Sequence, residues 1–221
     1  MVLATKPKAK KPAKTKVTAL TVSLVLDETG SMDVCRDATI GGFNEYIDEL
    51  SKRKERIRFT LTKFNSTKIE MVCDGLAVKD VARLNRDTYV PAAMTPLYDA
   101  IAQTIRATEQ SAKGDSVLLV VMTDGEENAS HEYNRDRLLK LIQKKEKAGW
   151  TFVYLGANQD AWAVGQSIGV PGGNTMTYAA TPDGVPMAAA ALAGSTVRFA
   201  AAGASQSRTF FKQSKSRAKR A

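Results

Sequence analysis

The chain has 221 residues, of which 43% are hydrophobic and 25% are charged, a composition typical of a globular domain. Two cysteines are too few for a disulfide-built scaffold and lack the paired spacing of a zinc site, and no apolar run approaches the ~20 residues of a membrane helix. Because the beginning of the chain lacks the apolar core of a secretory signal, we expect a cytoplasmic protein in which Cys35 and Cys73 are reduced, with a bridge between them as the alternative.

The net charge of +9 is concentrated at the two ends of the chain. Twelve basic residues and no acid lie there: Lys6, Lys8, Lys10, Lys11, Lys14, Lys16, Arg208, Lys212, Lys215, Arg217, Lys219 and Arg220. The remaining 20 basic and 23 acidic residues leave the body of the chain at −3. We therefore predict one domain over 18–206 between two basic tails, 1–17 and 207–221. We expect the N-terminal tail to be disordered because it is poor in apolar side chains, and most of the C-terminal tail resembles it in composition.

From residue 20 onward, strand and helix patterns alternate along the chain. In chain order the expected elements are a strand at 20–26, a helix at about 33–53, strands at 56–64 and 67–73, a helix from Pro96, a strand at 116–122, a helix at 134–148, a strand at 151–155, a helix at 159–168, a strand at 175–179 and an alanine-rich helix after Thr181. The two-residue link at 65–66 favours an antiparallel hairpin, and Asp74-Gly75 indicates a turn. The pattern predicts an α/β domain with a Rossmann-like, doubly wound, mostly parallel sheet, one antiparallel edge strand and helices on both faces.

Polar side chains gather where these strands and their connecting loops end. Asp27, Thr29 and Ser31 follow the first strand, Thr95 precedes the helix that starts at Pro96, and Asp124 follows the strand at 116–122. In such sheets, ligands bind at the carboxyl ends of the strands. Two carboxylates and three hydroxyls are hard oxygen donors of the kind that Mg²⁺ prefers, and they would leave the ion formally neutral with an open position for another anion.

These residues resemble the metal-ion-dependent adhesion site (MIDAS) of von Willebrand factor A domains. The match consists of Asp27-x-Thr29-x-Ser31, then Thr95, then Asp124-Gly125, with Thr29 at a position where the family usually has serine. The phrases LDETGSM, TIGGFNEYI, YVPAAMTPLYDAI and MTDGEENAS are similar to small stand-alone members from bacteria and phages, and the resemblance covers about residues 18–200.

The resemblance implies a metal-binding module for protein–protein interaction rather than an enzyme. Thr29, Ser31 and Thr95 would supply hydroxyl ligands to Mg²⁺, or to Mn²⁺ or Ca²⁺, with Thr95 binding only in some states. Asp27 and Asp124 would bind the ion directly or through water. The partner would be another protein that presents an acidic residue to the metal.

Several alternatives stay open at this level. Asp27, Ser31 and Asp124 could simply cap helices, although this does not explain Thr95. The basic tails could make the chain a nucleic-acid-associated structural protein, or they could only keep it soluble. A phosphoryl-transfer enzyme is disfavoured because Thr29 stands where such enzymes carry a second acid.

The sequence also gives expectations for the acids near the five residues. Glu28, Glu126 and Glu127 are expected to form a solvent-facing rim. Asp99 lies one helical turn beyond Thr95 and either orients a hydroxyl or a water, or is a surface charge.

Overall fold

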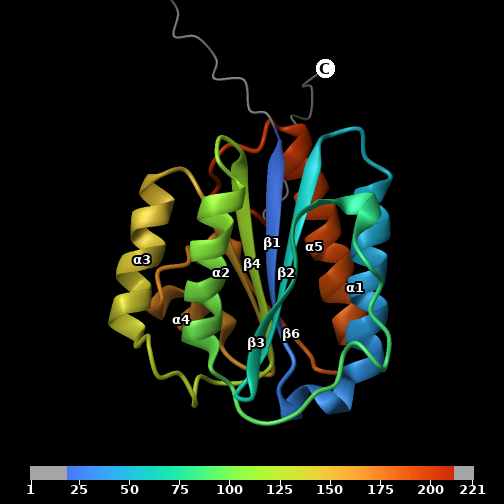
Figure 1. Ribbon diagram of the computed structural model, residues 1–221, viewed down its shortest axis with the longest axis vertical. Coiled ribbons are helices and arrows are strands. Elements are labelled where there is room, and N and C mark those ends of the chain that lie inside the picture. Colours follow the sequence, from blue (N-terminus) through green and yellow to red (C-terminus); the bar gives the residue numbers. More distant parts are fainter. Residues whose placement is uncertain (1–18, 212–221) are drawn as a thin grey trace, which may run out of the picture.

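The computed structural model describes residues 19–211. They form three layers, with one sheet between two layers of helices (Figure 1). The six strands are β1 (Leu20–Asp27), β2 (Ile57–Asn65), β3 (Lys68–Ala77), β4 (Ser116–Thr123), β5 (Thr151–Ala157) and β6 (Thr175–Tyr178). Their order across the sheet is β3-β2-β1-β4-β5-β6. Every pair is parallel except β2 with β3, which is antiparallel at one edge. The predicted fold class is confirmed.

Five α-helices within residues 19–211 cover the two faces of the sheet. They are α1 (Arg36–Ser51), α2 (Leu97–Ser111), α3 (Arg135–Lys147), α4 (Ala161–Ser167) and α5 (Gly184–Ala201), with short 3-10 helices at η1 (Gly30–Cys35), η2 (Val78–Asp80) and η3 (Gly172–Asn174). Helices α1 and α5 cover one face, and α2, α3 and α4 cover the other (Figure 1).

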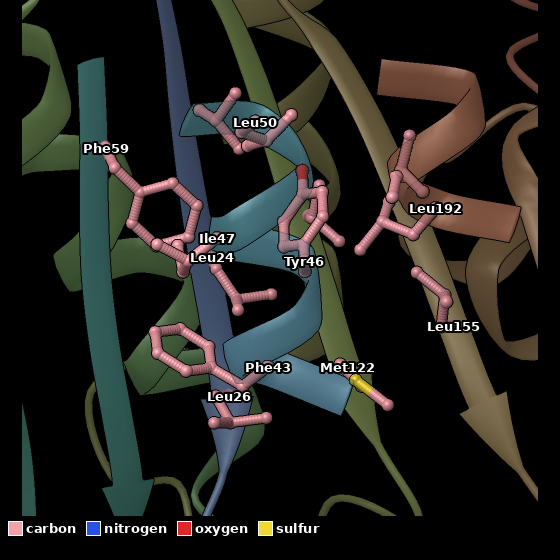
Figure 2. Close-up of a cluster of buried hydrophobic side chains, with 14 of the residues drawn as sticks. Leu24, Leu26, Phe43, Tyr46, Ile47, Leu50, Phe59, Met122, Leu155 and Leu192 are labelled. Atoms are coloured by element: carbon pink, nitrogen blue, oxygen red, sulfur yellow. The ribbon is translucent and has the colours of Figure 1, made fainter. Parts of the chain in front are cut away.

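The core lies against both faces of the sheet, because β1 and β5 are buried along their whole length and β4 is buried from Val117 onward. In β1, Leu24 and Leu26 point toward α1 and α5, while Val25 joins the opposite cluster. Figure 2 shows Phe43 and Tyr46 of α1 close to the strand residues on this side. Each fully buried large side chain contributes about 2–3 kcal/mol through burial. This packing holds β1 and β4 side by side.

The predicted turn at Asp74-Gly75 is wrong. Both residues lie within β3, where the pairing with β2 shifts in register around Leu61. Gly75 has a φ of 62°, and its N–H donates to the Thr60 hydroxyl, which itself donates to the Asp74 carboxylate. Asp74-Gly75 therefore forms an irregularity within a longer strand, where the positive φ of glycine is needed, and not a turn that ends the strand.

Residues 1–18 and 212–221, which include most of both predicted basic tails, lie outside the described residues. The packing continues beyond residue 206, the predicted end of the domain, because Phe210 is buried with its ring 5.9 Å from that of Phe199. Cys35 and Cys73 are free thiols, as expected.

Candidate metal centre

The first motif lies at the carboxyl end of β1, in the middle of the sheet. From β1 the chain proceeds to β2 and β3 on one side and later returns to β4 on the other, so the strand order reverses between β1 and β4. Asp27 is the last residue of β1 and has no exposed surface. One oxygen of its carboxylate accepts the Thr29 N–H at 2.8 Å, which folds the loop back over the strand end.

Hydrogen bonds connect the hydroxyls of this loop to the acid after β4. The Thr29 and Ser31 hydroxyl oxygens lie 3.3 Å apart, and the Ser31 hydroxyl donates to Asp124 at 2.6 Å. Thr29 is buried, Asp124 is half-buried and Ser31 is exposed. The group therefore opens to solvent on the side of Ser31 and Asp124.

Thr95 reaches the same place from the loop before α2. Its N–H donates to the Asn128 side chain at 2.8 Å, and its carbonyl accepts the Asn128 N–H at 3.1 Å. A Cβ added to Gly125 would lie 3.0 Å from the Thr95 hydroxyl oxygen, so the absence of a side chain at Gly125 allows this close approach. The structure thus brings the five predicted residues together at the carboxyl ends of the central strands.

Burial is the main influence on the electrostatics of the two acids. Burial raises the pKa of Asp27 to about 6, although hydrogen bonds from Thr123 and Thr29 oppose the shift and the nearby charge of Asp124 adds to it. Burial also raises the pKa of Asp124, opposed by the hydrogen bond from Ser31. Within residues 19–211, neither carboxylate forms an ion pair with a Lys, Arg or His side chain.

The donor set suits a small, hard divalent cation. No three His, Cys, Asp or Glu side chains gather in a metal-binding arrangement in the described part of the chain, so an ion here would depend on hydroxyls as well as acids. The two carboxylates and three hydroxyls provide only oxygen donors, which Mg²⁺, Mn²⁺ and Ca²⁺ accept. The residues present therefore fit such an ion.

The helix-cap alternative is wrong. Helix α1 has Cys35 at its N-cap without a side-chain hydrogen bond to the helix, and α3 is capped by Asn134, which accepts the Arg137 N–H. The 3-10 helix η1 has Thr29 at its N-cap, also without a side-chain cap hydrogen bond. Asp27, Ser31 and Asp124 thus do not cap η1, α1 or α3.

Two contacts to Asp27 come from residues that the sequence analysis missed. The Thr123 hydroxyl donates to the second carboxylate oxygen of Asp27 at 2.5 Å, and the Tyr89 hydroxyl donates to the Asp27 carbonyl at 2.6 Å. Thr123 could have been noticed, because it directly precedes Asp124. No local signal points to Tyr89, whose role depends on a contact 62 residues away.

The predicted acidic rim is only partly correct. Glu126 is exposed, as expected, but Glu28 is 2% exposed and forms an ion pair with Lys63 at 2.9 Å. Glu127 is half-buried and accepts the Tyr98 N–H at 2.8 Å.

Asp99 matches neither predicted role. It is buried, and its carboxylate accepts backbone N–H groups of His131, Glu132 and Tyr133. It therefore fixes the segment that follows Asp124.

No protein-family profile and no curated protein matches the chain. Solved structures do share its fold. The vWF domain of the type V pili tip protein Mfa5 from Porphyromonas gingivalis aligns with a TM-score of 0.58 at 9% identity, over 83% of this chain and 96% of that one. The chain has the fold of a von Willebrand factor A domain.

Two further structures have this von Willebrand factor A-like fold. The pilus adhesin SpaC from Lactobacillus rhamnosus GG aligns with a TM-score of 0.63 at 12% identity, over 82% of this chain and 30% of that one. The mussel byssus protein PTMP1, solved with a zinc-occupied MIDAS motif, aligns with a TM-score of 0.57 at 11% identity, over 79% of this chain. The chain spans only 47% of the mussel protein.

None of the helices in residues 19–211 is long and apolar enough to cross a membrane.

Proposed function

We propose that this chain is a divalent-cation-dependent protein-binding module rather than an enzyme. The observation that carries the proposal is the convergence of two buried or half-buried carboxylates and three hydroxyls at the switch point of the sheet, where neither carboxylate forms an ion pair within residues 19–211. Asp27, Thr29, Ser31, Thr95 and Asp124 would hold Mg²⁺, or Mn²⁺ or Ca²⁺. When bound, the ion would offer an open position to a carboxylate of a partner protein.

Some residues at this centre fix the buried acid, and others are accessible to a partner. The Thr123 hydroxyl and the Thr29 N–H each donate to one carboxylate oxygen of Asp27, which fixes the orientation of this carboxylate. The exposed Ser31 and the half-buried Asp124 lie on the open side, where a partner can approach. The chain thus supplies a fixed, buried acid and an accessible face.

The similar structures support binding over catalysis. One is described as a pilus adhesin, another as a pili tip protein, and a third holds zinc at a MIDAS motif. These descriptions concern those proteins. We extend the binding function to this chain because it shares their fold and carries the five residues.

The test is a calorimetric titration of Mg²⁺ and then Mn²⁺ into the chelator-stripped full chain. We expect one saturable site that is lost in Asp27→Ala and weakened in Thr95→Ala. Glu126→Gln is the matched control, because it removes an exposed carboxylate from the same loop as Asp124. No heat and no thermal stabilisation of the parent chain would overturn the metal-dependent mechanism.

A second candidate function uses the basic tails. The described ends of the chain both lie at the sheet edge opposite the five residues, since Leu20 begins β1 and the Phe211 N–H donates to Gly173 just before β6. Tail-dependent, metal-independent binding of DNA or RNA in low salt would favour a nucleic-acid-associated role. The predicted cytoplasmic location stays a prediction.

A further inference from the structure

A buried ion pair lies directly beside the candidate metal centre. Glu28 is located between Asp27 and Thr29 in the sequence, yet its carboxylate lies 2.9 Å from the ammonium group of Lys63. Lys63 is on β2, opposite Leu26 in the parallel register. The two side chains are only 3% and 6% exposed.

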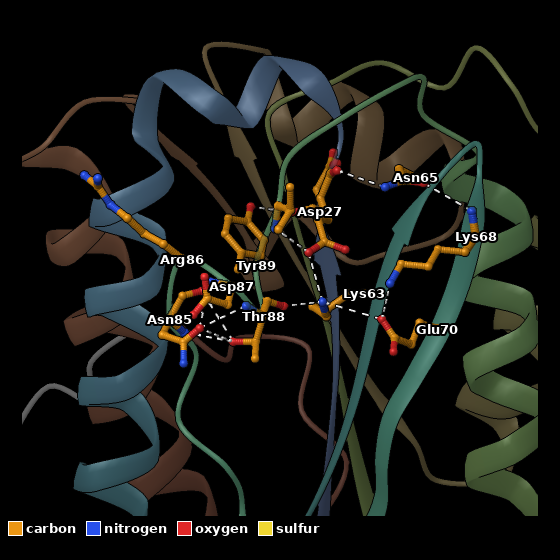
Figure 3. Close-up of polar contacts among 12 residues, drawn as sticks. Asp27, Lys63, Asn65, Lys68, Glu70, Asn85, Arg86, Asp87, Thr88 and Tyr89 are labelled. Carbon is orange, nitrogen blue, oxygen red and sulfur yellow. Dashed lines mark hydrogen bonds and ion pairs between the residues drawn. The ribbon is translucent and has the colours of Figure 1, made fainter.

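The pair also holds two backbone groups of the loop that leads to Thr95. We call residues 85–95 the Thr95 loop. The Lys63 ammonium donates to the Thr88 carbonyl and lies 3.5 Å from Glu70 (Figure 3). The Glu28 carboxylate accepts the Val90 N–H at 2.7 Å. The pair therefore connects β1, β2 and the Thr95 loop.

Backbone hydrogen bonds continue this attachment along the rest of the loop. The Ala92 N–H donates to the Glu28 carbonyl at 3.0 Å, and the Ala93 carbonyl accepts the Gly30 N–H at 3.1 Å. The Met94 carbonyl accepts the Ser66 N–H at 2.9 Å. The next residue is Thr95, so this attachment acts on its position together with the two hydrogen bonds between Thr95 and Asn128.

Strain at Ala93 is a second, independent observation. Ala93 has a φ of 62°, in the left-handed region that residues with a Cβ rarely adopt. Such a conformation persists only where the surrounding contacts impose it. The contacts at Glu28, Gly30 and Ser66 surround this residue and account for its conformation.

Stability alone is a weak reason for the pair, because buried ion pairs can often be replaced by apolar side chains without loss. We propose that Glu28 and Lys63 are positioning residues for the metal centre. They place the Thr95 loop so that the Thr95 hydroxyl reaches the site formed by Asp27, Thr29, Ser31 and Asp124. This inference rests on the proposed function.

The test compares two variants that each remove a carboxylate from a buried lysine. Glu28→Ala acts beside the Thr95 loop. Glu109→Ala is the control, because Glu109 pairs with the buried Lys145 near the far end of α2, about 20 Å along the helix from Thr95. In the full chain, we expect Glu28→Ala to weaken Mn²⁺ binding about tenfold and Glu109→Ala to leave it unchanged.

A double-mutant cycle separates positioning from a general loss of structure. Thr95→Ala should weaken Mn²⁺ binding in the parent chain but have little further effect in Glu28→Ala, since the hydroxyl is already misplaced. Glu28→Gln keeps an oxygen for the Val90 N–H and should restore most of the affinity. Unchanged Mn²⁺ binding in Glu28→Ala, or fully additive effects with Thr95→Ala, would overturn the inference and leave the proposed function intact.

Hydrogen exchange provides a readout that needs no metal. In the metal-free chain, the amides of Val90 and Ala92 should exchange faster in Glu28→Ala than in Glu109→Ala. If the parent chain did not bind Mn²⁺, the proposed function would be wrong. The exchange rates would then still test whether Glu28 holds the Thr95 loop in place. Equal rates in the two variants would overturn the inference in either case.

Discussion

Asp27 and Glu28 are consecutive acids at the end of one strand, yet they have opposite surroundings. Asp27 is contacted by neutral donors, the Thr29 N–H and the Thr123 hydroxyl, and its pKa is raised to about 6. Glu28 is equally buried but faces the ammonium group of Lys63. Asp27 ends β1, whereas Glu28 begins the loop after it and directs its carboxylate to Lys63 of β2.

The difference shows how buried acids can be assigned different roles. Glu28 has its counter-ion within the chain, so its charge is already compensated and it serves the structure. Asp27 forms no ion pair with a Lys, Arg or His side chain among the described residues, and a cation from outside would compensate its charge, as the proposed metal site requires.

The largest expected effect comes from removing the counter-ion of Glu28. Lys63→Met leaves a buried carboxylate unpaired and should lower the free energy of unfolding by about 3–5 kcal/mol, measured by urea denaturation. The double variant Glu28→Gln/Lys63→Met removes both charges and should recover most of the loss. A decrease below about 1 kcal/mol in Lys63→Met would contradict the assignment of Glu28 as a compensated charge.

An intermediate effect of opposite sign is expected at Asp27. Its pKa is higher in the folded chain than the usual value of 3.8, so the charged form destabilises the metal-free fold above pH 6 and this penalty disappears below pH 3.8. Asp27→Asn should therefore raise the free energy of unfolding at pH 8 by about 2 kcal/mol.

The measurement is chemical denaturation of both chains in chelator at several pH values. The gain from Asp27→Asn should shrink as the pH falls from 6 to 4. A variant that is less stable than the parent at pH 8 would show that the Asp27 charge is already compensated, and the contrast with Glu28 would then fail.

The smallest effect is expected in the strained part of the Thr95 loop. Ala93→Gly removes the Cβ from a residue with a positive φ and should raise the free energy of unfolding by about 0.5–1 kcal/mol. Ala92→Gly is the matched control, because Ala92 is also exposed and has no positive φ, so it should lower stability by a similar amount. Equal destabilisation by both changes would argue against strain at Ala93.

The sequence by itself determined the α/β class and the members of the candidate site. Apolar runs such as 20–26 and 116–122 are too short for membrane helices. They alternate along the chain with segments of helical periodicity, and this order predicts buried parallel strands. Asp27 comes directly after the first of these runs, and Asp124 follows the second after one intervening residue, Thr123. Parallel strands end on the same side of a sheet, so the order of the elements places both acids at the carboxyl ends of strands. That β1 and β4 are neighbours is a feature of the tertiary structure.

Only the tertiary structure decided which acids and hydroxyls have partners. Glu28 was expected at the surface because nothing near it in the sequence indicates Lys63, and Tyr89 has no local signal for its contact with Asp27. Asp74-Gly75 has the chemistry of a turn but lies inside β3. These outcomes depend on the register between strands and on a loop packed across them, and local periodicity carries no information about either.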